Sequence, residues 1–163
     1  METPVVQERM GLRGFFHVQI EENGKIVGDS GWVKNTVTNL GFNQFLVSSL
    51  GSIAGSKYLA SMALGTGTEP GAAATTLQGE LLNSTGGEVR AALTAATSSG
   101  SKTLRLTATF ASAASFASAS QNISNVGLFA AGAGGTIFAG NTFASSTVAT
   151  NQNVNATYDI IFS

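Results

Sequence analysis

The longest stretch without charge is the feature of this sequence that most restricts its fold. Between Leu106 and Ser163, the last third of the chain, Asp159 is the only charged side chain. Ser, Thr, Asn, Gln, Ala and Gly fill this stretch, punctuated by Phe, Ile, Leu and Val. An ordinary soluble surface is roughly a quarter charged. We expect the charge-poor surface of such a folded chain to be covered by further copies of the chain or by a larger lattice. Assembly is therefore the first hypothesis.

The overall composition narrows the classes of protein that fit. The 163 residues suit one domain, or one domain with an arm, and 43% of them are hydrophobic, which is enough for a sizeable core. Only 10% are charged and the formal net charge is −1, so no basic field would attract nucleic acid and little repulsion would keep copies apart. There is no cysteine, which excludes disulfides and thiolate chemistry and fits folding in a reducing cytoplasm.

The beginning of the sequence predicts an extended arm rather than a targeting segment. Residues 1–14 contain no apolar stretch of the kind found in signal peptides, and no apolar run is long enough to cross a bilayer. Residues 1–10 are polar, include Pro4 and show no hydrophobic period. The expected organisation is an arm over residues 1–11 and a single domain over residues 12–163, with no membrane partner.

Residues 12–37 predict a β-hairpin. Alternating apolar residues predict a strand over 12–22, and the Asn-Gly pair that follows is typical of a type I′ turn, which needs positive φ at both central positions. This turn would place Glu22 opposite Lys25 and Ile20 opposite Val27. The Gly-Asp-Ser-Gly sequence at 28–31 predicts a break or bulge before the strand resumes over 32–37.

Residues 39–50 predict one helix. Thr38 or Asn39 can cap it, and Gly51 offers a stop. The apolar side chains at helical spacing form a narrow face, so we expect the helix to lie flat on a sheet. These side chains are Phe42, Phe45, Leu46 and Leu50.

The remaining sequence predicts more short strands. Together with the hairpin they make about eight strands and one helix, which favours an all-β fold: an antiparallel β-sandwich, jelly-roll-like, with one short helix near residues 39–50 and an extended N-terminal arm. Residues 65–74 are expected to form a loop and residues 111–120 a connection. The further strands are expected over 59–64, 88–97, 102–110, 123–130, 136–143 and 153–162.

Catalytic motifs are weak. The only histidine, His17, lies in a predicted strand, where an outward-facing polar residue or a satisfied core residue is the simpler reading. Residues 28–31 match the nucleophile segment of trypsin-like proteases, but a turn explains these four common residues better, because such proteases carry their His and Asp in long preceding segments. One histidine without cysteine makes a zinc site unexpected. We predict neither an enzyme nor a cofactor.

Other candidate sites also have simpler structural explanations. The glycines at 65, 67, 132, 134 and 135 lack the spacing of phosphate-binding loops, so turns explain them. No spacing pairs the scattered acids for glycoside hydrolysis, and solvated carboxylates are the default reading. The aromatic residues could stack sugars on a receptor-binding face, although core or sheet-face positions are commoner. The acids are Glu69, Glu80, Glu88 and Asp159, and the aromatic residues are Phe15, Trp32 and Tyr58.

Several short sequence segments follow one another in a recognisable order. They are Trp32-Val33-Lys34-Asn35, Ala63-Leu64-Gly65-Thr66-Gly67-Thr68, Thr75-Thr76-Leu77, Ile123-Ser124-Asn125-Val126-Gly127-Leu128-Phe129 and Tyr158-Asp159-Ile160-Ile161-Phe162. From Trp32 onward, this series resembles small structural proteins of tailed bacteriophages. The resemblance implies a β-sandwich, often jelly-roll-like, that assembles into symmetric multimers on a virion. Members include capsid decoration (cement) proteins and tail or baseplate components. The shared positions look like turns and core, so no functional residue is carried over.

The leading hypothesis is a non-enzymatic capsid decoration protein, assembled in the host cytoplasm and located on the virion. It would bind the outer face of an icosahedral head as a homotrimer and bridge capsomers of the major capsid protein lattice, stabilising the shell because it binds only the intact lattice. The charge-poor half would form the subunit interface. The arm would contact the lattice through Thr3, Pro4, Val5, Val6, Gln7, Glu8, Arg9 and Met10.

Two alternatives remain open besides the weaker enzyme reading. The chain could be a tail, baseplate or fibre component of the same virion, although it lacks the repeats or heptads of a long fibre. It could also be a carbohydrate-binding jelly-roll used for host adhesion. That function predicts an exposed aromatic cluster in a groove with polar groups alongside.

Overall fold

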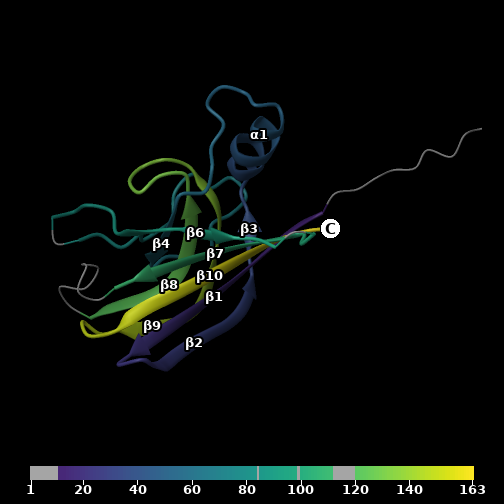
Figure 1. Cartoon of the computed structure of the whole chain (residues 1–163). Helices are drawn as coiled ribbons and strands as arrows, with labels where there is room; N and C mark the ends of the chain where they lie inside the picture. The colour runs from purple at the N-terminus through teal and green to yellow at the C-terminus, as the bar shows by residue number, and fades with distance from the viewer. Residues whose placement is uncertain (1–10, 84, 99, 112–119) are drawn as a thin grey trace, which may run out of the picture.

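The fold follows from a computed structural model that describes residues 11–83, 85–98, 100–111 and 120–163. The candidate lattice contact over residues 3–10 lies outside the described residues. Most of the connection expected over residues 111–120 lies outside them too. Gly11 is the first described residue, and its backbone exchanges two hydrogen bonds with Ser163, so both ends of the described chain meet at one edge of the molecule (Figure 1).

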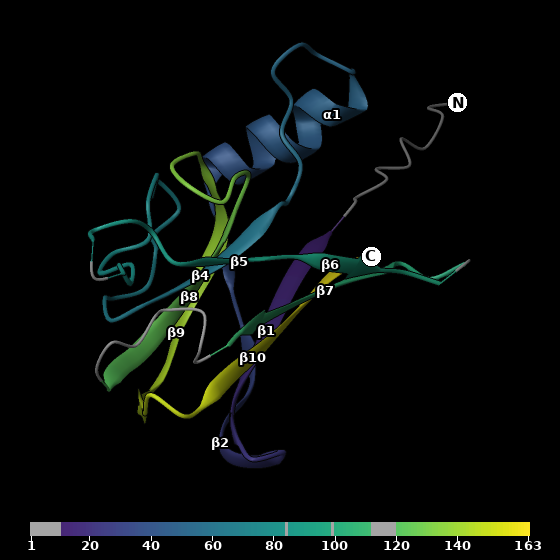
Figure 2. The ribbon, with the colours of Figure 1, turned by 60° about the vertical axis from the view of Figure 1, so that its left-hand side comes forward.

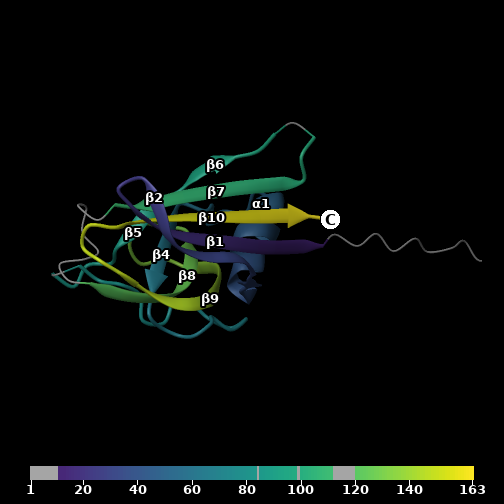
Figure 3. The same cartoon turned by 90° about the horizontal axis from the view of Figure 1, so that it is seen from below.

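The strands form two antiparallel five-stranded sheets, which confirms the predicted β-sandwich. Sheet A has the order β2-β1-β10-β7-β6, and Figure 3 shows β6, β7, β10 and β1 side by side. Sheet B has the order β3-β9-β8-β4-β5. The bounds are β1 Leu12–Glu22, β2 Lys25–Lys34, β3 Thr36–Val37, β4 Ser61–Gly65, β5 Arg90–Ala92, β6 Thr94–Ala96, β7 Thr103–Phe110, β8 Gln121–Phe129, β9 Ile137–Val148 and β10 Asn153–Phe162.

Two strands cross from one sheet to the other at opposite edges of the sandwich. The strand expected over residues 32–37 leaves sheet A at Asn35 and continues in sheet B as β3. The strand expected over residues 88–97 leaves sheet B at Leu93 and continues in sheet A as β6. Such corners join the edges of two packed sheets. They explain why the described chain has more strands than the eight expected.

The strand pairs are nested from the ends of the chain inward. β1 pairs with β10, β3 with β9, β4 with β8, and β6 with β7, all antiparallel. This arrangement is jelly-roll-like, as predicted.

The predicted first hairpin is confirmed except for its register beyond the turn. Asn23 and Gly24 both have positive φ, and Glu22 lies opposite Lys25. The predicted pair of Ile20 and Val27 is wrong, because a register shift places Gly28 opposite Ile20. A side chain on Gly28 would crowd Ile20 at 3.2 Å, so glycine suits this position.

The main core lies between the sheets. From sheet A it takes the alternating inward residues of β1 and β10, including Phe16 and Tyr158, as the sequence pattern predicts. Sheet B contributes residues such as Leu64 and Phe138. A second, smaller cluster lies on the opposite side of sheet B. There Leu77, from the loop between β4 and β5, packs on Ala63, Phe129 and Ile137.

The predicted helix is present, and Thr38 caps it. The Thr38 Oγ1 accepts a hydrogen bond from the Gly41 N–H at 2.9 Å, which is the geometry of an N-cap. Residues η1 Gly41–Val47 have the wide turns of a π-helix, and α1 Ser48–Leu50 ends it. The helix stops at Gly51, as expected. Gly51 itself has a φ of −88°, and the left-handed conformation falls on the next residue, Ser52, with a φ of 49°.

The helix packs on β9 at one end of the sandwich (Figure 2). At Gly41 a Cβ would lie 2.2 Å from the Phe138 carbonyl oxygen, so only glycine permits this approach. The Phe45 ring meets the Phe138 ring edge-on, with the centroids 5.2 Å apart. Gln44 adds a hydrogen bond from the Thr136 hydroxyl at 3.1 Å.

Candidate functional site

The Gly-Asp-Ser-Gly segment forms a bulge in β2. His17 Nε2 lies 2.5 Å from Asp29 Oδ1, so a His–Asp pair is present on the surface of sheet A. The Ser30 Oγ accepts a hydrogen bond from the Val18 N–H at 2.9 Å and donates one to the Gly31 carbonyl at 2.8 Å. Its hydroxyl therefore serves the bulge, and no hydrogen bond joins it to His17 within the described part of the chain.

The Gly-Thr-Gly segment at 65–67 is a packing element of the loop that covers sheet B. A Cβ on Gly67 would lie 2.2 Å from the Gln78 carbonyl oxygen, so close backbone approach explains this glycine. The Thr66 N–H donates to the Gly79 carbonyl at 2.9 Å, and the Thr68 N–H donates to Gln78 Oε1 at 3.2 Å. Because these amides are used within the chain, they are not presented to a phosphate.

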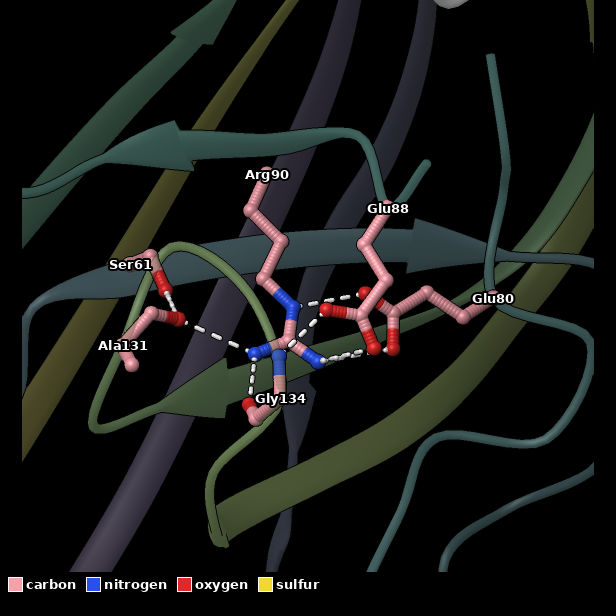
Figure 4. A network of polar contacts seen from close by, with 6 residues as sticks. All are labelled: Ser61, Glu80, Glu88, Arg90, Ala131 and Gly134. Atoms are coloured by element: carbon pink, nitrogen blue, oxygen red, sulfur yellow. Dashed lines mark hydrogen bonds and ion pairs between the residues drawn. The ribbon is translucent and has the colours of Figure 1, made fainter. Parts of the chain in front are cut away.

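Two of the acids expected to be scattered meet at one guanidinium. Arg90 Nε lies 2.6 Å from Glu80 Oε1, and Arg90 Nη2 lies 3.0 Å from Glu80 Oε2 and 3.3 Å from Glu88 Oε1 (Figure 4). The expectation of separate, solvated acids is wrong for Glu80 and for Asp159, whose side chains are 11% and 12% exposed. Glu69 receives a hydrogen bond from the Thr36 hydroxyl, and Asp159 pairs with Arg105.

The Arg90 cluster fastens two loops to sheet B. Arg90 Nη1 donates to the carbonyl oxygens of Ala131 and Gly134 in the β8–β9 loop, and the Gly134 N–H donates to Glu88 (Figure 4). The guanidinium lies over the Phe129 ring at 3.6 Å. With Arg90 only 2% exposed, both carboxylates are committed to a buried cation, so we assign the cluster a structural role.

Within the described ranges, no group of three or more His, Asp and Glu side chains is placed to hold a metal ion. In the same ranges, no helix combines the length and hydropathy needed to cross a bilayer.

The charge-poor segment forms the middle of the sandwich. β10 lies between β1 and β7 in sheet A, while β8 lies between β9 and β4 in sheet B. Most side chains of β8 and about half of those of β10 are buried. Burial within the sandwich therefore explains why this segment has so few charged residues, since central strands covered on at least one face carry few charges.

Instead, exposed apolar side chains gather around the helix. The predicted inward face is only partly correct: Phe45 is buried, but Phe42 is 44% exposed and Leu50 is 83% exposed. We name this region the helix patch. Its members are the large apolar side chains Phe42, Val47, Leu50, Ile53 and Tyr58, which account for five of the nine such exposed residues in the described chain.

Two apolar hollows adjoin the helix patch. One, of about 280 Å³, is lined by Phe45, Leu46, Ser49, Leu50 and Phe162. The other, of about 200 Å³, shares Phe45, Leu46, Ser49 and Phe162 and extends to Lys57, Tyr58, Leu59, Leu104, Phe138 and Ile160. Protruding apolar side chains thus stand directly beside apolar hollows. This surface was not predicted from the sequence, although Val47 and Ile53 are apolar residues outside the narrow face expected for the helix.

Comparisons with family models, with curated proteins and with solved structures found no match to this chain.

Proposed function

We propose that this chain is a non-enzymatic structural protein of a tailed-phage virion, which decorates the outer surface of an icosahedral capsid and bridges its capsomers. The helix patch is the observation that carries the proposal. Monomeric soluble proteins rarely expose contiguous apolar patches larger than roughly 300–600 Å² unless a partner covers them. The helix patch gathers five exposed large apolar side chains around one short helix, and two of them, Leu50 and Tyr58, line apolar hollows. The proposed location on a virion rests on the resemblance of the sequence to phage structural proteins.

A second copy of the chain fits the helix patch best. Apolar knobs such as Leu50 and Tyr58 stand beside apolar hollows, so the knob of one copy can enter the hollow of the next. The net charge of −1 gives little repulsion between copies. We therefore place the subunit contact of the proposed homotrimer at the helix patch, in place of the charge-poor segment.

Substitution of Leu50 by Glu tests the subunit contact. The side chain is already largely exposed, so the variant should fold, while a charge in an apolar interface should abolish self-association. Sedimentation velocity of the wild type is expected to show an oligomer, and that of Leu50→Glu a monomer. Leu82→Glu is the matched control, because Leu82 is 51% exposed and lies outside the helix patch. A monomeric wild type, or equal loss in both variants, would contradict the assignment.

The arm remains the proposed lattice contact, with the major capsid protein as partner. A chain lacking residues 1–10 is expected to fold and self-associate but to stop co-sedimenting with purified, undecorated capsids. Unchanged co-sedimentation would remove the arm from the proposal. A tail or baseplate position is the second candidate, since the helix patch would serve assembly there equally well.

A further inference from the structure

The outer face of sheet A carries polar and aromatic side chains at its centre. Across the strands, Trp32 of β2 lies opposite His17 of β1, and Asp159 of β10 lies between Phe15 and Arg105. The β4–β5 loop partly covers the outer side of sheet B, where the second apolar cluster lies. That cluster does not extend to the outer face of sheet A.

Trp32 provides an aromatic surface on this face. Its side chain is 51% exposed, although tryptophan is highly buried on average. The His17 ring supports it with the centroids 5.1 Å apart and the planes tilted by 34°. The Arg105 guanidinium carbon lies 5.8 Å from the centre of the indole ring. The ring is therefore held in place by neighbours while half of its surface stays open.

A hollow with a mixed lining of apolar and hydroxyl groups lies beside Arg105, which also neighbours the indole ring. It has a volume of about 240 Å³, and Arg105 forms part of its wall. Arg105 uses Nε and Nη2 on Asp159, at 2.8 and 2.7 Å, and Nη1 has no hydrogen-bond partner in the described chain. The other lining residues, mostly hydroxyl-bearing, are Ala96, Thr97, Ser98, Ser101 and Thr103.

Charge and polarity decide which ligand class suits the hollow. Asp159 pairs with Arg105. The further cations of this face, Lys34 and Arg13, are matched in number by Asp29 and Glu21, so there is no surplus of positive charge to hold a polyanion. Hydroxyl groups in the lining disfavour a purely apolar ligand. An aromatic ring beside hydroxyls, a guanidinium N–H and a carboxylate matches a molecule with one apolar face and many hydroxyls.

We infer that the outer face of sheet A binds a neutral saccharide, with one sugar ring on Trp32 and the adjoining sugar in the hollow beside Arg105. The apolar C–H face of a pyranose stacks on the indole, and its hydroxyls exchange hydrogen bonds with Arg105 Nη1 and the hollow's hydroxyls. This inference goes beyond the proposed virion role and does not depend on it, because it uses none of the residues of the helix patch.

Trp32 is the only tryptophan, so its fluorescence reports on the proposed site directly. The experiment titrates the full chain with maltoheptaose, cellohexaose and chitohexaose, and with dextran sulfate as a polyanion probe. At least one neutral oligosaccharide is expected to shift Trp32 emission saturably. By isothermal titration calorimetry, Trp32→Ala should weaken this binding by at least about tenfold, whereas Trp32→Phe should retain part of it.

Tyr58→Ala is the matched control, because Tyr58 is an exposed aromatic residue of the helix patch and should leave saccharide binding unchanged. The inference is overturned if none of the three neutral oligosaccharides binds, if only dextran sulfate binds, or if Trp32→Ala binds as well as the wild type. Emission that changes on dilution without saccharide would also overturn it, because a second copy would then cover the face.

Discussion

Arg90 and Arg105 each hold a carboxylate through two nitrogens, but one is buried and the other is open. The Arg90 side chain is 2% exposed and also binds two loop carbonyls, whereas the Arg105 side chain is 54% exposed and keeps Nη1 unpartnered in the described chain. Removing one partner of a buried pair costs about 3–5 kcal/mol, while exposed pairs contribute roughly 0–1 kcal/mol. The same chemical pair can therefore hold a fold together in one place and present a surface to a ligand in another.

The largest expected effect is that of Arg90→Ala. It leaves Glu80 buried without its cation and frees the β8–β9 loop, so the free energy of unfolding should fall by about 3–5 kcal/mol. Urea denaturation followed by circular dichroism measures this change. A decrease in the free energy of unfolding below about 1 kcal/mol would show that the Arg90 cluster does not hold the loops on sheet B. It would also remove the contrast between the two arginines.

Arg105→Ala should have a smaller effect on stability. Because the guanidinium is exposed, loss of its ion pair should lower the free energy of unfolding by at most about 1 kcal/mol. However, Asp159 is only 12% exposed and loses its partner, so we expect a total of about 1–2 kcal/mol. Under the same denaturation protocol, a decrease in the free energy of unfolding equal to that of Arg90→Ala would contradict the distinction between a buried structural arginine and an exposed one.

The smallest effect is that of Asp29→Asn, and it depends on pH. Hydrogen bonds from the Gln19 side chain, the Gly31 N–H and His17 lower the pKa of Asp29 to about 2, below its ordinary value of 3.8. A lowered pKa stabilises the folded state above pH 3.8, and this stabilisation disappears as the pH falls through 2. Asp29 is 44% exposed, so solvent screening limits the effect to about 1 kcal/mol or less.

The wild type should therefore be slightly more stable than Asp29→Asn at neutral pH, and the difference should vanish near pH 2. Thermal unfolding measured between pH 2 and 7 compares the two. A difference that stays constant over this range would mean that the carboxylate does not interact as the geometry of the bulge indicates.

The strands that depend on local pattern could be predicted from the sequence. The bounds of β1 and β10 agree with the alternation of apolar residues, and the positive φ of Asn23 and Gly24 follows from the Asn-Gly turn. Alternation shows which side chains face a core, but not to which sheet a strand belongs. For that reason the crossings at Asn35 and Leu93 were not predicted.

The sites were harder to predict because they depend on contacts between distant segments. The Arg90 cluster joins residues around positions 80, 88 and 134, and no spacing in the sequence relates them. The helix patch depends on how the helix is turned on β9, which Gly41 and Phe138 decide together. The candidate lattice contact lies outside the described residues and stays a prediction.

The number of copies per virion tests the central proposal most directly. In tailed-phage virions purified from cells that produce this chain, quantitative mass spectrometry would compare its abundance with that of the major capsid protein. We predict near-stoichiometric abundance, as a protein that bridges capsomers over the whole head requires. A few copies per virion would place the chain in the tail or baseplate, and complete absence would contradict a virion role altogether.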